Sequence, residues 1–193
     1  MTAPDEAQRR RNRMKLLAIV AIFIVPMIVA GLMRFTDHYP AARRQKGELL
    51  QPPGDMRAMS PRLLDGSAYA WKPVERQWRI LVPAPTVCDE DCERVARDLG
   101  TVWQLLGKDA DRVDVLWQCS TTPCGWPARA TRPTTLRLLA HDPALRARLP
   151  KLDAGVGVPV YVVDPNGFVV LRYAPGSDLA GVRSDLSRLL KLR

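Results

Sequence analysis

Histidine and aromatic side chains are scarce in this sequence. Its 193 residues include two histidines, His38 and His141, and only 6% of the residues are phenylalanine, tryptophan or tyrosine. Few aromatic rings are therefore available for stacking on bases, and we find no nucleic-acid-binding motif. The net charge of +9 would suit a polyanion, but the basic residues are spread along the chain and cluster only at the N-terminus. We predict no nucleic-acid partner.

The sequence also lacks internal repeats and low-complexity tracts. Charged residues make up 25% of the chain, which excludes a polytopic membrane protein. Hydrophobic residues make up 47%, enough for the core of one ordinary domain plus an attachment.

The single long hydrophobic run is LLAIVAIFIVPMIVAGLM, residues 16–33, and it contains no charge. As a helix it would span about 27 Å, close to the thickness of a bilayer core. Pro26 is tolerable in a membrane helix. The run is longer than the apolar region of a cleaved signal, about 7–15 residues. It therefore predicts a retained single-pass anchor.

The flanks of this run predict its orientation. Five basic residues precede it within residues 1–15, whereas Arg34 alone follows closely. By the positive-inside rule, residues 1–15 form a cytoplasmic tail and the C-terminal part lies outside. In a bacterium this is a protein of the inner (plasma) membrane with a periplasmic domain, in a compartment where disulfides persist.

Residues 34–73 are predicted to form a juxtamembrane linker, because no hydrophobic period is sustained there. Its basic residues either contact lipid headgroups or belong to a solvated charged spacer. We interpret His38 as incidental. The prolines that interrupt the segment are Pro40, Pro52, Pro53, Pro61 and Pro73.

Residues 74–193 are predicted to form the folded domain. WRILV (residues 78–82) and VDVLW (residues 113–117) are short apolar runs typical of strands. Between them, apolar residues recur at helical spacing until Gly107. A strand, a helix and a strand within about 40 residues indicate a right-handed βαβ unit with parallel strands.

The second half of the domain predicts a helix around residues 135–149 and then a hairpin. Two β-rich runs, residues 159–163 and 168–173, flank the turn DPNG at residues 164–167. A final amphipathic helix follows. The order βαβ, helix, ββα is that of an α/β, thioredoxin-like fold, a mixed sheet flanked by helices.

Cys88 and Cys92 are the candidate site residues. Cys88 follows the first predicted strand and Cys92 lies in the first turn of the next helix, where the helix dipole lowers a thiol pKa. Residues four apart share a helical face, so the pair can form a disulfide or bind a soft cation.

Carboxylates surround this pair, and they act in two opposite ways. At a helix N-terminus they stabilise the helix, but they raise the pKa of a neighbouring thiol. The same charge favours a bound cation or a basic partner surface. The residues are Asp89, Glu90, Asp91 and Glu93.

Cys119 and Cys124 form a second pair, in CSTTPC. Four intervening residues with Pro123 can close a small disulfide loop, so a structural bridge is the first interpretation. The alternative is a resolving pair that exchanges with Cys88 and Cys92, because both pairs follow adjacent parallel strands. The spacings fit no common structural zinc site.

Three stretches resemble the Sco/SenC family of membrane-anchored, thioredoxin-like copper chaperones, which assist cytochrome c oxidase assembly: WRILVPAPTVCDEDC, LGKDADRVDVLW and YVVDPNG. More narrowly, the chain is similar to Sco-related membrane proteins of proteobacterial oxidase gene neighbourhoods. The resemblance implies that Cys88 and Cys92 are the C-x-x-x-C copper and redox pair. It implies Cu(I) as the metal, and an oxidase subunit or another assembly factor as the partner.

The chain departs from the family pattern in two ways. Asp89 and Glu93 stand where Sco proteins have prolines, and AGVGVPVYVV, before and within the hairpin strand, lacks the family's histidine ligand. Two thiolates without a third ligand suit Cu(I) better than Cu(II). His141 is either a surface helix residue beside Asp142 or a substitute ligand.

Two further alternatives stay open. Pro159 matches the position of the thioredoxin cis-proline, which faces the active cysteines, but an ordinary trans proline at a strand start is equally suitable. The alternative functions are a general periplasmic thiol–disulfide oxidoreductase and a scaffold with structural disulfides only.

Overall fold

The computed structural model describes residues 6–35 and 45–191. The chain divides into two compact units, Met1–Arg43 and Arg44–Arg193, and each is described by itself. The predicted features that lie outside the described residues are the tail residues 1–5, His38, Pro40, Arg43 and Arg44.

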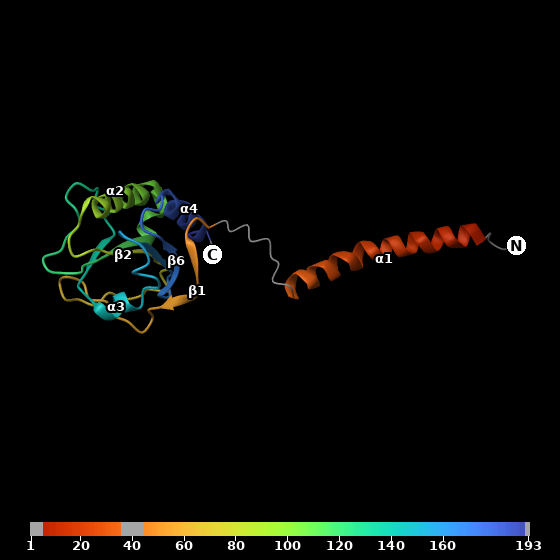
Figure 1. The fold of residues 1–193 in the computed structure, drawn as a ribbon, viewed down its shortest axis with the longest axis horizontal. Coiled ribbons are helices and arrows are strands. Elements are labelled where there is room, and N and C mark those ends of the chain that lie inside the picture. The colour runs from red at the N-terminus through yellow and green to blue at the C-terminus, as the bar shows by residue number, and fades with distance from the viewer. Residues whose placement is uncertain (1–5, 36–44, 192–193) are drawn as a thin grey trace. The chain divides into compact units, whose positions relative to one another are not determined.

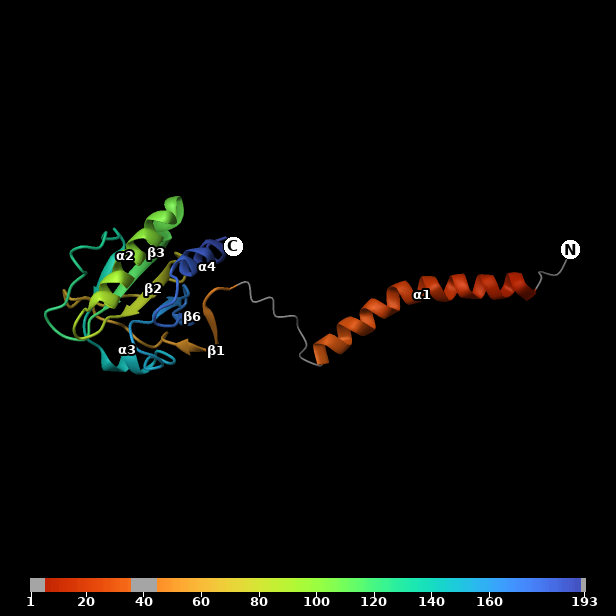
Figure 2. The same ribbon diagram turned by 45° about the horizontal axis from the view of Figure 1, so that its top comes forward.

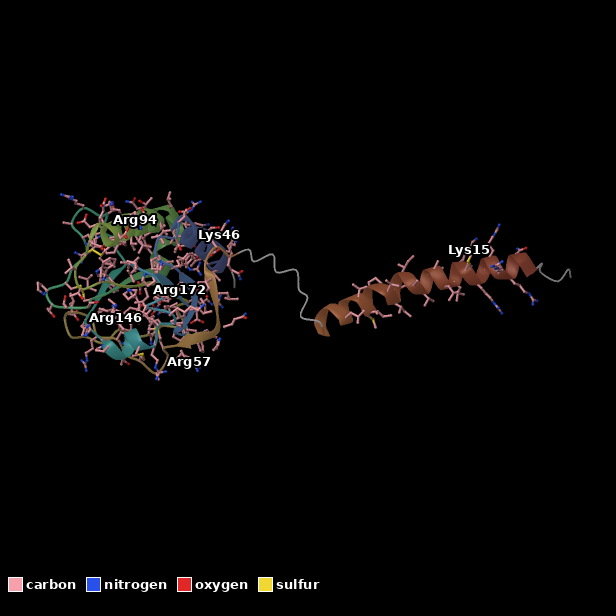
Figure 3. The ribbon with its side chains drawn as sticks, viewed as in Figure 1. Lys15, Lys46, Arg57, Arg94, Arg146 and Arg172 are labelled. Carbon is pink, nitrogen blue, oxygen red and sulfur yellow. A yellow bond between two sulfur atoms is a disulfide. The ribbon has the colours of Figure 1, made fainter. Side chains whose placement is uncertain are left out.

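The first unit is one helix, α1 (Glu6–Phe35), which includes Pro26 (Figure 1). Its segment Gln8–Leu32 is long and apolar enough to cross a membrane, and none of that segment is buried against other protein. The predicted apolar helix at residues 16–33 is therefore confirmed. The helix extends into the predicted tail, where Lys15 projects from its N-terminal half (Figure 3).

The second unit is built on a six-stranded mixed sheet in the order β1-β6-β5-β2-β3-β4. β2, β3 and β4 run parallel, β5 is antiparallel to β2, and β6 is antiparallel to both β5 and β1. The strands are Glu48–Asp55 (β1), Trp78–Pro83 (β2), Val113–Gln118 (β3), Leu136–Leu139 (β4), Val160–Val163 (β5) and Phe168–Tyr173 (β6).

Helices cover both faces of this sheet. α2 and α4 lie over one face and α3 over the other (Figures 1 and 2). The 3-10 helix η1 follows α2 at Gly107, whose φ of +58° ends α2 as the sequence predicts. The helices are Glu90–Leu105 (α2), Gly107–Arg112 (η1), Pro143–Ala147 (α3) and Ala180–Leu189 (α4).

Two hydrophobic clusters fill the layers, because alternate residues of each strand point to opposite faces. In β2, Ile80 packs with the apolar stripe of α2, whereas Leu81 packs on the other face with Leu145 of α3. Both strand residues are fully buried. The thioredoxin-like mixed sheet flanked by helices is therefore confirmed, including the parallel β2–α2–β3 unit.

The predicted hairpin is also present, between β5 and β6. Asp164 fixes its turn, because one carboxylate oxygen accepts hydrogen bonds from the backbone N–H groups of Asn166, Gly167 and Phe168 at 2.7–2.9 Å. Gly167 has a φ of +101°, which suits glycine.

The helix predicted at residues 135–149 is wrong for its first half. Leu136–Leu139 form β4, which pairs in parallel with β3, and only Pro143–Ala147 are helical. Pro143 stands at the start of α3, where Asp142 caps the helix by accepting a hydrogen bond from Leu145 N–H. A proline in the middle of the predicted helix would have removed a hydrogen bond and clashed with the preceding turn.

The sequence assigns residues 34–73 to a linker, but Glu48–Asp55 form an edge strand paired with β6. The two prolines that argue against a strand, Pro52 and Pro53, fall where the pairing register shifts between Leu49 and Gly54. An edge strand with such an irregularity needs no ladder hydrogen bond from a proline. The later part of the segment packs on the sheet through Met56 and Tyr69.

The start of the folded unit is held by one buried carboxylate on α4. Asp185, 2% exposed, accepts hydrogen bonds at one oxygen from Lys46 N–H at 2.8 Å and Gly47 N–H at 3.0 Å. The same oxygen accepts from the hydroxyl of Tyr173 at 2.7 Å. Burial, together with this carboxylate, raises the pKa of Tyr173. Asp185 thus joins the chain before β1, the strand β6 and α4.

Replacing Asp185 by alanine should lower the free energy of unfolding by about 2–3 kcal/mol, because a buried hydroxyl and two backbone donors lose their acceptor. Chemical denaturation of the full chain in detergent micelles measures this. Asp153→Ala, at an exposed loop position, is the matched control and should change stability by less than about 0.5 kcal/mol. Equal losses of unfolding free energy in the two variants would show that Asp185 does not hold these three segments together.

Glu48 of β1 predicts a pH dependence. Its carboxylate pairs with Lys151 and, at 3.4 Å, with the buried Arg172, and the hydrogen bond from Lys151 leads the causes that lower its pKa. A carboxyl whose pKa is lower in the folded state stabilises the fold at pH values above its unfolded pKa. This contribution is lost as the pH falls through the folded-state pKa. Because Glu48 and Lys151 are partly exposed, we expect their ion pair to contribute less than about 1 kcal/mol to the free energy of unfolding.

The measurement compares wild type with Glu48→Gln by urea unfolding at about pH 6 and about pH 3. The wild type should be the more stable protein at the higher pH and should lose most of its advantage at the lower pH. A stability difference that does not change with pH would exclude this role of Glu48.

Candidate functional site

The candidate site lies where the chain leaves β2 and enters α2. Asp89 is the N-cap of α2, with extended backbone, and its side chain accepts a hydrogen bond from Cys92 N–H at 3.0 Å. Pro85 lies between β2 and α2 and has no backbone N–H, so it cannot donate a helical hydrogen bond in this connection. Cys88 therefore stands just before the cap and Cys92 in the first helical turn, as the sequence predicts.

Cys88 and Cys92 form a disulfide whose Cα atoms are 5.1 Å apart. The two sulfurs have different surroundings. Cys92 is fully buried among the residues of the α2 core cluster, including Val95, whereas Cys88 is exposed. One end of the bridge is therefore open to a partner from solvent, and the other end is sealed inside the domain.

This asymmetry fixes the order of a thiol exchange. An incoming thiolate reaches Cys88, forms a bond to its sulfur, and displaces Cys92 as a thiolate. The leaving sulfur lies in the first turn of a helix of 16 residues, where the positive end of the dipole stabilises negative charge. Cys88 is thus the sulfur that an external thiolate can reach, and Cys92 is the buried sulfur that such an attack would displace.

Two of the four carboxylates around the pair form ion pairs with arginines of α2. Asp91 pairs with Arg94 at 3.0 Å and Glu93 pairs with Arg97 at 3.5 Å. Sequence reasoning missed these ion pairs, although their i,i+3 and i,i+4 spacings signal them. The opposition between carboxylates and helix dipole is thus weaker than the composition of the stretch suggests.

The predicted bridge between Cys119 and Cys124 is present, with Cα atoms 5.8 Å apart. Cys119 follows β3, is 1% exposed, and donates its backbone N–H to Leu139 of β4 at 3.0 Å. Cys124 is half-buried. Trp126 packs edge-to-face on Trp117 with ring centroids 5.0 Å apart, which fixes the chain after the bridge.

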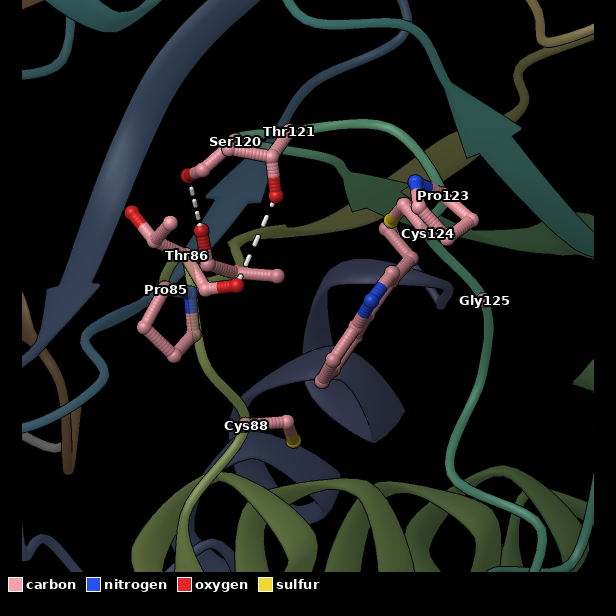
Figure 4. Close-up of a pocket in the computed structure, with 10 residues that line it drawn as sticks. Pro85, Thr86, Cys88, Ser120, Thr121, Pro123, Cys124 and Gly125 are labelled. Atoms are coloured by element: carbon pink, nitrogen blue, oxygen red, sulfur yellow. Dashed lines mark hydrogen bonds between the residues drawn. The ribbon is translucent and has the colours of Figure 1, made fainter.

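A cavity of about 130 Å³ lies between the two bridges (Figure 4). Cys88 lines it from one side and Cys124 from the other. Two hydrogen bonds join its walls, from the hydroxyl of Ser120 to the carbonyl of Ala84 and from that of Thr121 to Thr86 at 3.5 Å. Nothing in the sequence signalled this cavity, because loops after different strands form it.

The cysteine pair is the candidate donor set for a metal. Within residues 6–35 and 45–191 there is no group of three or more histidine, cysteine, aspartate or glutamate side chains that could hold a metal ion. His141 is exposed and lies between β4 and α3 rather than in a helix. The two cysteines, once reduced, supply two soft sulfurs, a donor set that fits Cu(I) and not Cu(II).

The segment that lacks the family histidine nevertheless faces the cysteine helix. A Cβ added to Gly157 would lie 3.9 Å from a carboxylate oxygen of Asp91, and the φ of +113° at this position favours glycine. Pro159 lies two residues further on and is buried. Among the described residues the cis peptide bonds precede Pro52 and Pro123, so Pro159 follows a trans bond.

Comparisons with known proteins agree with the architecture. Residues 78–193 match the family model described as a transmembrane-like, thioredoxin-like, C-terminal domain, and residues 6–37 match the transmembrane-like, N-terminal domain. No curated protein sequence matches the chain.

Solved structures of Sco proteins resemble the domain. BsSco, a member of the Sco family of cytochrome c oxidase assembly proteins, superposes with a TM-score of 0.56 at 13% identity, covering 76% of this chain and 98% of that one. Apo Sco1 from Thermus thermophilus superposes with a TM-score of 0.55 at 17% identity, covering 75% of this chain and 96% of that one. Copper-bound ScoI from Arabidopsis thaliana superposes with a TM-score of 0.50 at 14% identity, covering 76% of this chain and 99% of that one. At these identities the likeness shows a shared fold.

Proposed function

Because the chain belongs to the transmembrane-like, thioredoxin-like family, we propose that it is a membrane-anchored, Sco-like factor that assists cytochrome c oxidase assembly. It acts by thiol redox or Cu(I) handling at Cys88 and Cys92. The observation that carries the proposal is the asymmetric C-x-x-x-C bridge, with Cys88 exposed and Cys92 buried at the first turn of α2. Its partner is an oxidase subunit or another assembly factor.

The proposed location is the inner membrane, with the N-terminus in the cytoplasm and the domain in the periplasm. The basic residues before the apolar part of α1 support this orientation. Two disulfides in one small domain support it as well, because disulfides persist in the periplasm and are rare in the cytosol.

In the redox branch of the proposal, the protein exchanges its bridge with a partner dithiol. A partner thiolate attacks the sulfur of Cys88, and Cys92 leaves as a thiolate that takes up a proton. A second partner thiolate attacks the mixed disulfide and releases Cys88. The partner is oxidised by two electrons and the pair is reduced, and the reverse reaction reduces a partner disulfide. In the metal branch, Cu(I) is cargo held by the two thiolates.

The metal branch is tested by Cu(I) titration of the reduced full chain in detergent micelles, against a competing chelator. One Cu(I) per chain is expected, with loss of binding in Cys88→Ser. The matched control is Cys119→Ser/Cys124→Ser, which removes the other bridge and should bind as wild type does. Binding that survives Cys88→Ser would exclude the site.

A general thiol–disulfide oxidoreductase is the second candidate, and the exposed sulfur of the Cys88–Cys92 bridge favours it, because exchange at that sulfur needs no metal. Chains that bind no Cu(I) but equilibrate Cys88–Cys92 with glutathione would support this candidate over copper handling. Chains that do neither would leave the scaffold with structural disulfides.

A further inference from the structure

Two disulfides face one cavity, and each presents one sulfur to it. Cys88 and Cys124 line the cavity, whereas Cys92 and Cys119 are 0% and 1% exposed and belong to the same core cluster. We propose that the two bridges form an internal disulfide relay in which Cys88 and Cys124 are the exchanging sulfurs. This goes beyond the proposed function: it requires thiol exchange at Cys88, but neither Cu(I) nor an oxidase partner.

The sheet brings the two loops together. β2 and β3 are parallel neighbours that end in register at Pro83 and Gln118, so the chain leaves both strands at one edge. The loops stay paired beyond that edge, because Ala84 N–H donates to the carbonyl of Gln118 at 2.9 Å. The hydroxyl of Ser120 donates back to the carbonyl of Ala84 (Figure 4). The two bridges therefore lie on opposite walls of one cavity.

Burial leaves a single route between them. A thiolate released at Cys88 meets Cys124 across the cavity, while Cys119 lies behind it in the core. Likewise, Cys92 is buried in the core cluster and does not line the cavity. Exchange between the pairs therefore passes through a bond between Cys88 and Cys124.

The wall that carries Cys124 has room to move across the cavity. Residues 120–125 are neither helix nor strand, and the bond from Thr121 to Thr86, at 3.5 Å, is at the weak limit of a hydrogen bond. The cavity of about 130 Å³ is roughly ten times the space that one water needs, so there is room between the walls for the Cys124 segment to approach Cys88.

The relay balances without an external oxidant. A partner dithiol first reduces the exposed Cys88–Cys92 bridge. The Cys88 thiolate then attacks the sulfur of Cys124, and Cys119 leaves as a thiolate that takes up a proton. Cys92, deprotonated, attacks Cys88 and displaces Cys124. The Cys88–Cys92 bridge is restored and Cys119 and Cys124 hold two electrons, so one chain oxidises two partner dithiols before it must be reoxidised.

The test traps the bond between the two walls. In full-length Cys92→Ser/Cys119→Ser in detergent micelles, mild oxidation should give an intramolecular Cys88–Cys124 disulfide as the main product, identified by peptide mapping. The matched control, Cys88→Ser/Cys124→Ser, retains the two buried sulfurs and should keep both thiols. Cys88 and Cys124 that stay alkylatable in the folded double variant, or that link only between chains, overturn the relay.

A second variant covers the case in which the double variant does not fold. Cys92→Ser keeps the Cys119–Cys124 bridge and a free Cys88, so attack on Cys124 should leave Cys119 as a free thiol in a measurable fraction of chains. Because Cys119 is buried, it is alkylated after acid quenching and denaturation and identified by peptide mapping. No labelled Cys119 overturns the relay. Failure of either variant leaves the Cu(I) test untouched, because Cu(I) binding is expected to persist in Cys119→Ser/Cys124→Ser, which lacks the second bridge.

Discussion

Replacing Cys88 by serine should slow thiol–disulfide exchange with a small dithiol or with glutathione by about a thousandfold or more. A serine hydroxyl forms no disulfide, and the remaining thiol of this pair, Cys92, is fully buried. The comparison is made in a Cys119→Ser/Cys124→Ser background, because Cys124 is half-buried and would react as well. A buried thiol reacts only when the structure opens, and an opening that costs about 4 kcal/mol reduces the rate by roughly a thousandfold. Stopped-flow alkylation and exchange of the reduced full chain in micelles measure both rates.

The matched variant is Cys92→Ser, which should behave in the opposite way. It keeps the exposed Cys88 but cannot resolve a mixed disulfide, so a disulfide-linked partner complex should accumulate. Mass spectrometry of complexes trapped in native membranes should identify a cytochrome c oxidase subunit or another assembly factor. Equal alkylation rates for Cys88 and Cys92 in the reduced wild type would contradict the asymmetry on which both predictions depend.

The difference in burial between Cys88 and Cys92 could have been predicted from the sequence. Val95, Leu99 and Val102 follow the α2 period, and Cys92 continues that apolar stripe one turn earlier. Asp89 is a residue type that commonly caps helices, which places Cys88 outside the helix. Local signals of this kind determine the position of a side chain because they act within one turn of the chain.

The misassigned elements depended on neighbours far away in the sequence. β4 is a strand because Leu136 pairs beside Val115 of β3, although its leucines also satisfy a helical spacing. β1 is a strand because β6 offers it an edge, in spite of two prolines. Intrinsic propensity is a weak guide where tertiary pairing supplies the hydrogen bonds.

The cavity between the two disulfides could not be predicted from the sequence either, because segments far apart in the chain form its walls. Its walls are joined by a serine and a threonine that bond to backbone carbonyls 36 and 35 residues away. Parallel strands in a predicted βαβ unit place Cys88 and Cys119 at the same edge, but they do not determine which sulfur faces the other. That information comes from the burial of Cys92 and Cys119.

A buried arginine on the face opposite α2 gives the second large prediction. Arg79 of β2 is fully buried and donates to the carbonyls of Asp164 and Pro165 at 3.0 and 3.1 Å. It also donates to the hydroxyl of Tyr69 at 2.8 Å, which in turn donates to Asp114 at 2.6 Å. One cation therefore links the β5–β6 turn, β3 and the segment before β2.

Replacing Arg79 by methionine should destabilise the domain by about 3–5 kcal/mol, the usual cost of removing one member of a buried charged network. The carbonyls of the turn lose their donor, and so does the Tyr69 hydroxyl that bonds to Asp114. For a unit of this size the midpoint of thermal unfolding should fall by about 10 °C or more. Calorimetry or circular dichroism of the full chain in micelles measures the shift.

Arg137→Met is the matched control, because Arg137 is an exposed arginine of β4, and it should change stability by less than about 0.5 kcal/mol. A double-mutant cycle separates the network from simple loss of packing. Because the Tyr69 hydroxyl connects Arg79 to Asp114, Arg79→Met and Tyr69→Phe should couple by about 0.5–3 kcal/mol. If the two losses instead add within error, the arm through Tyr69 and Asp114 does not act with Arg79, and the loss in Arg79→Met comes from its bonds to the turn carbonyls and from packing of its stem.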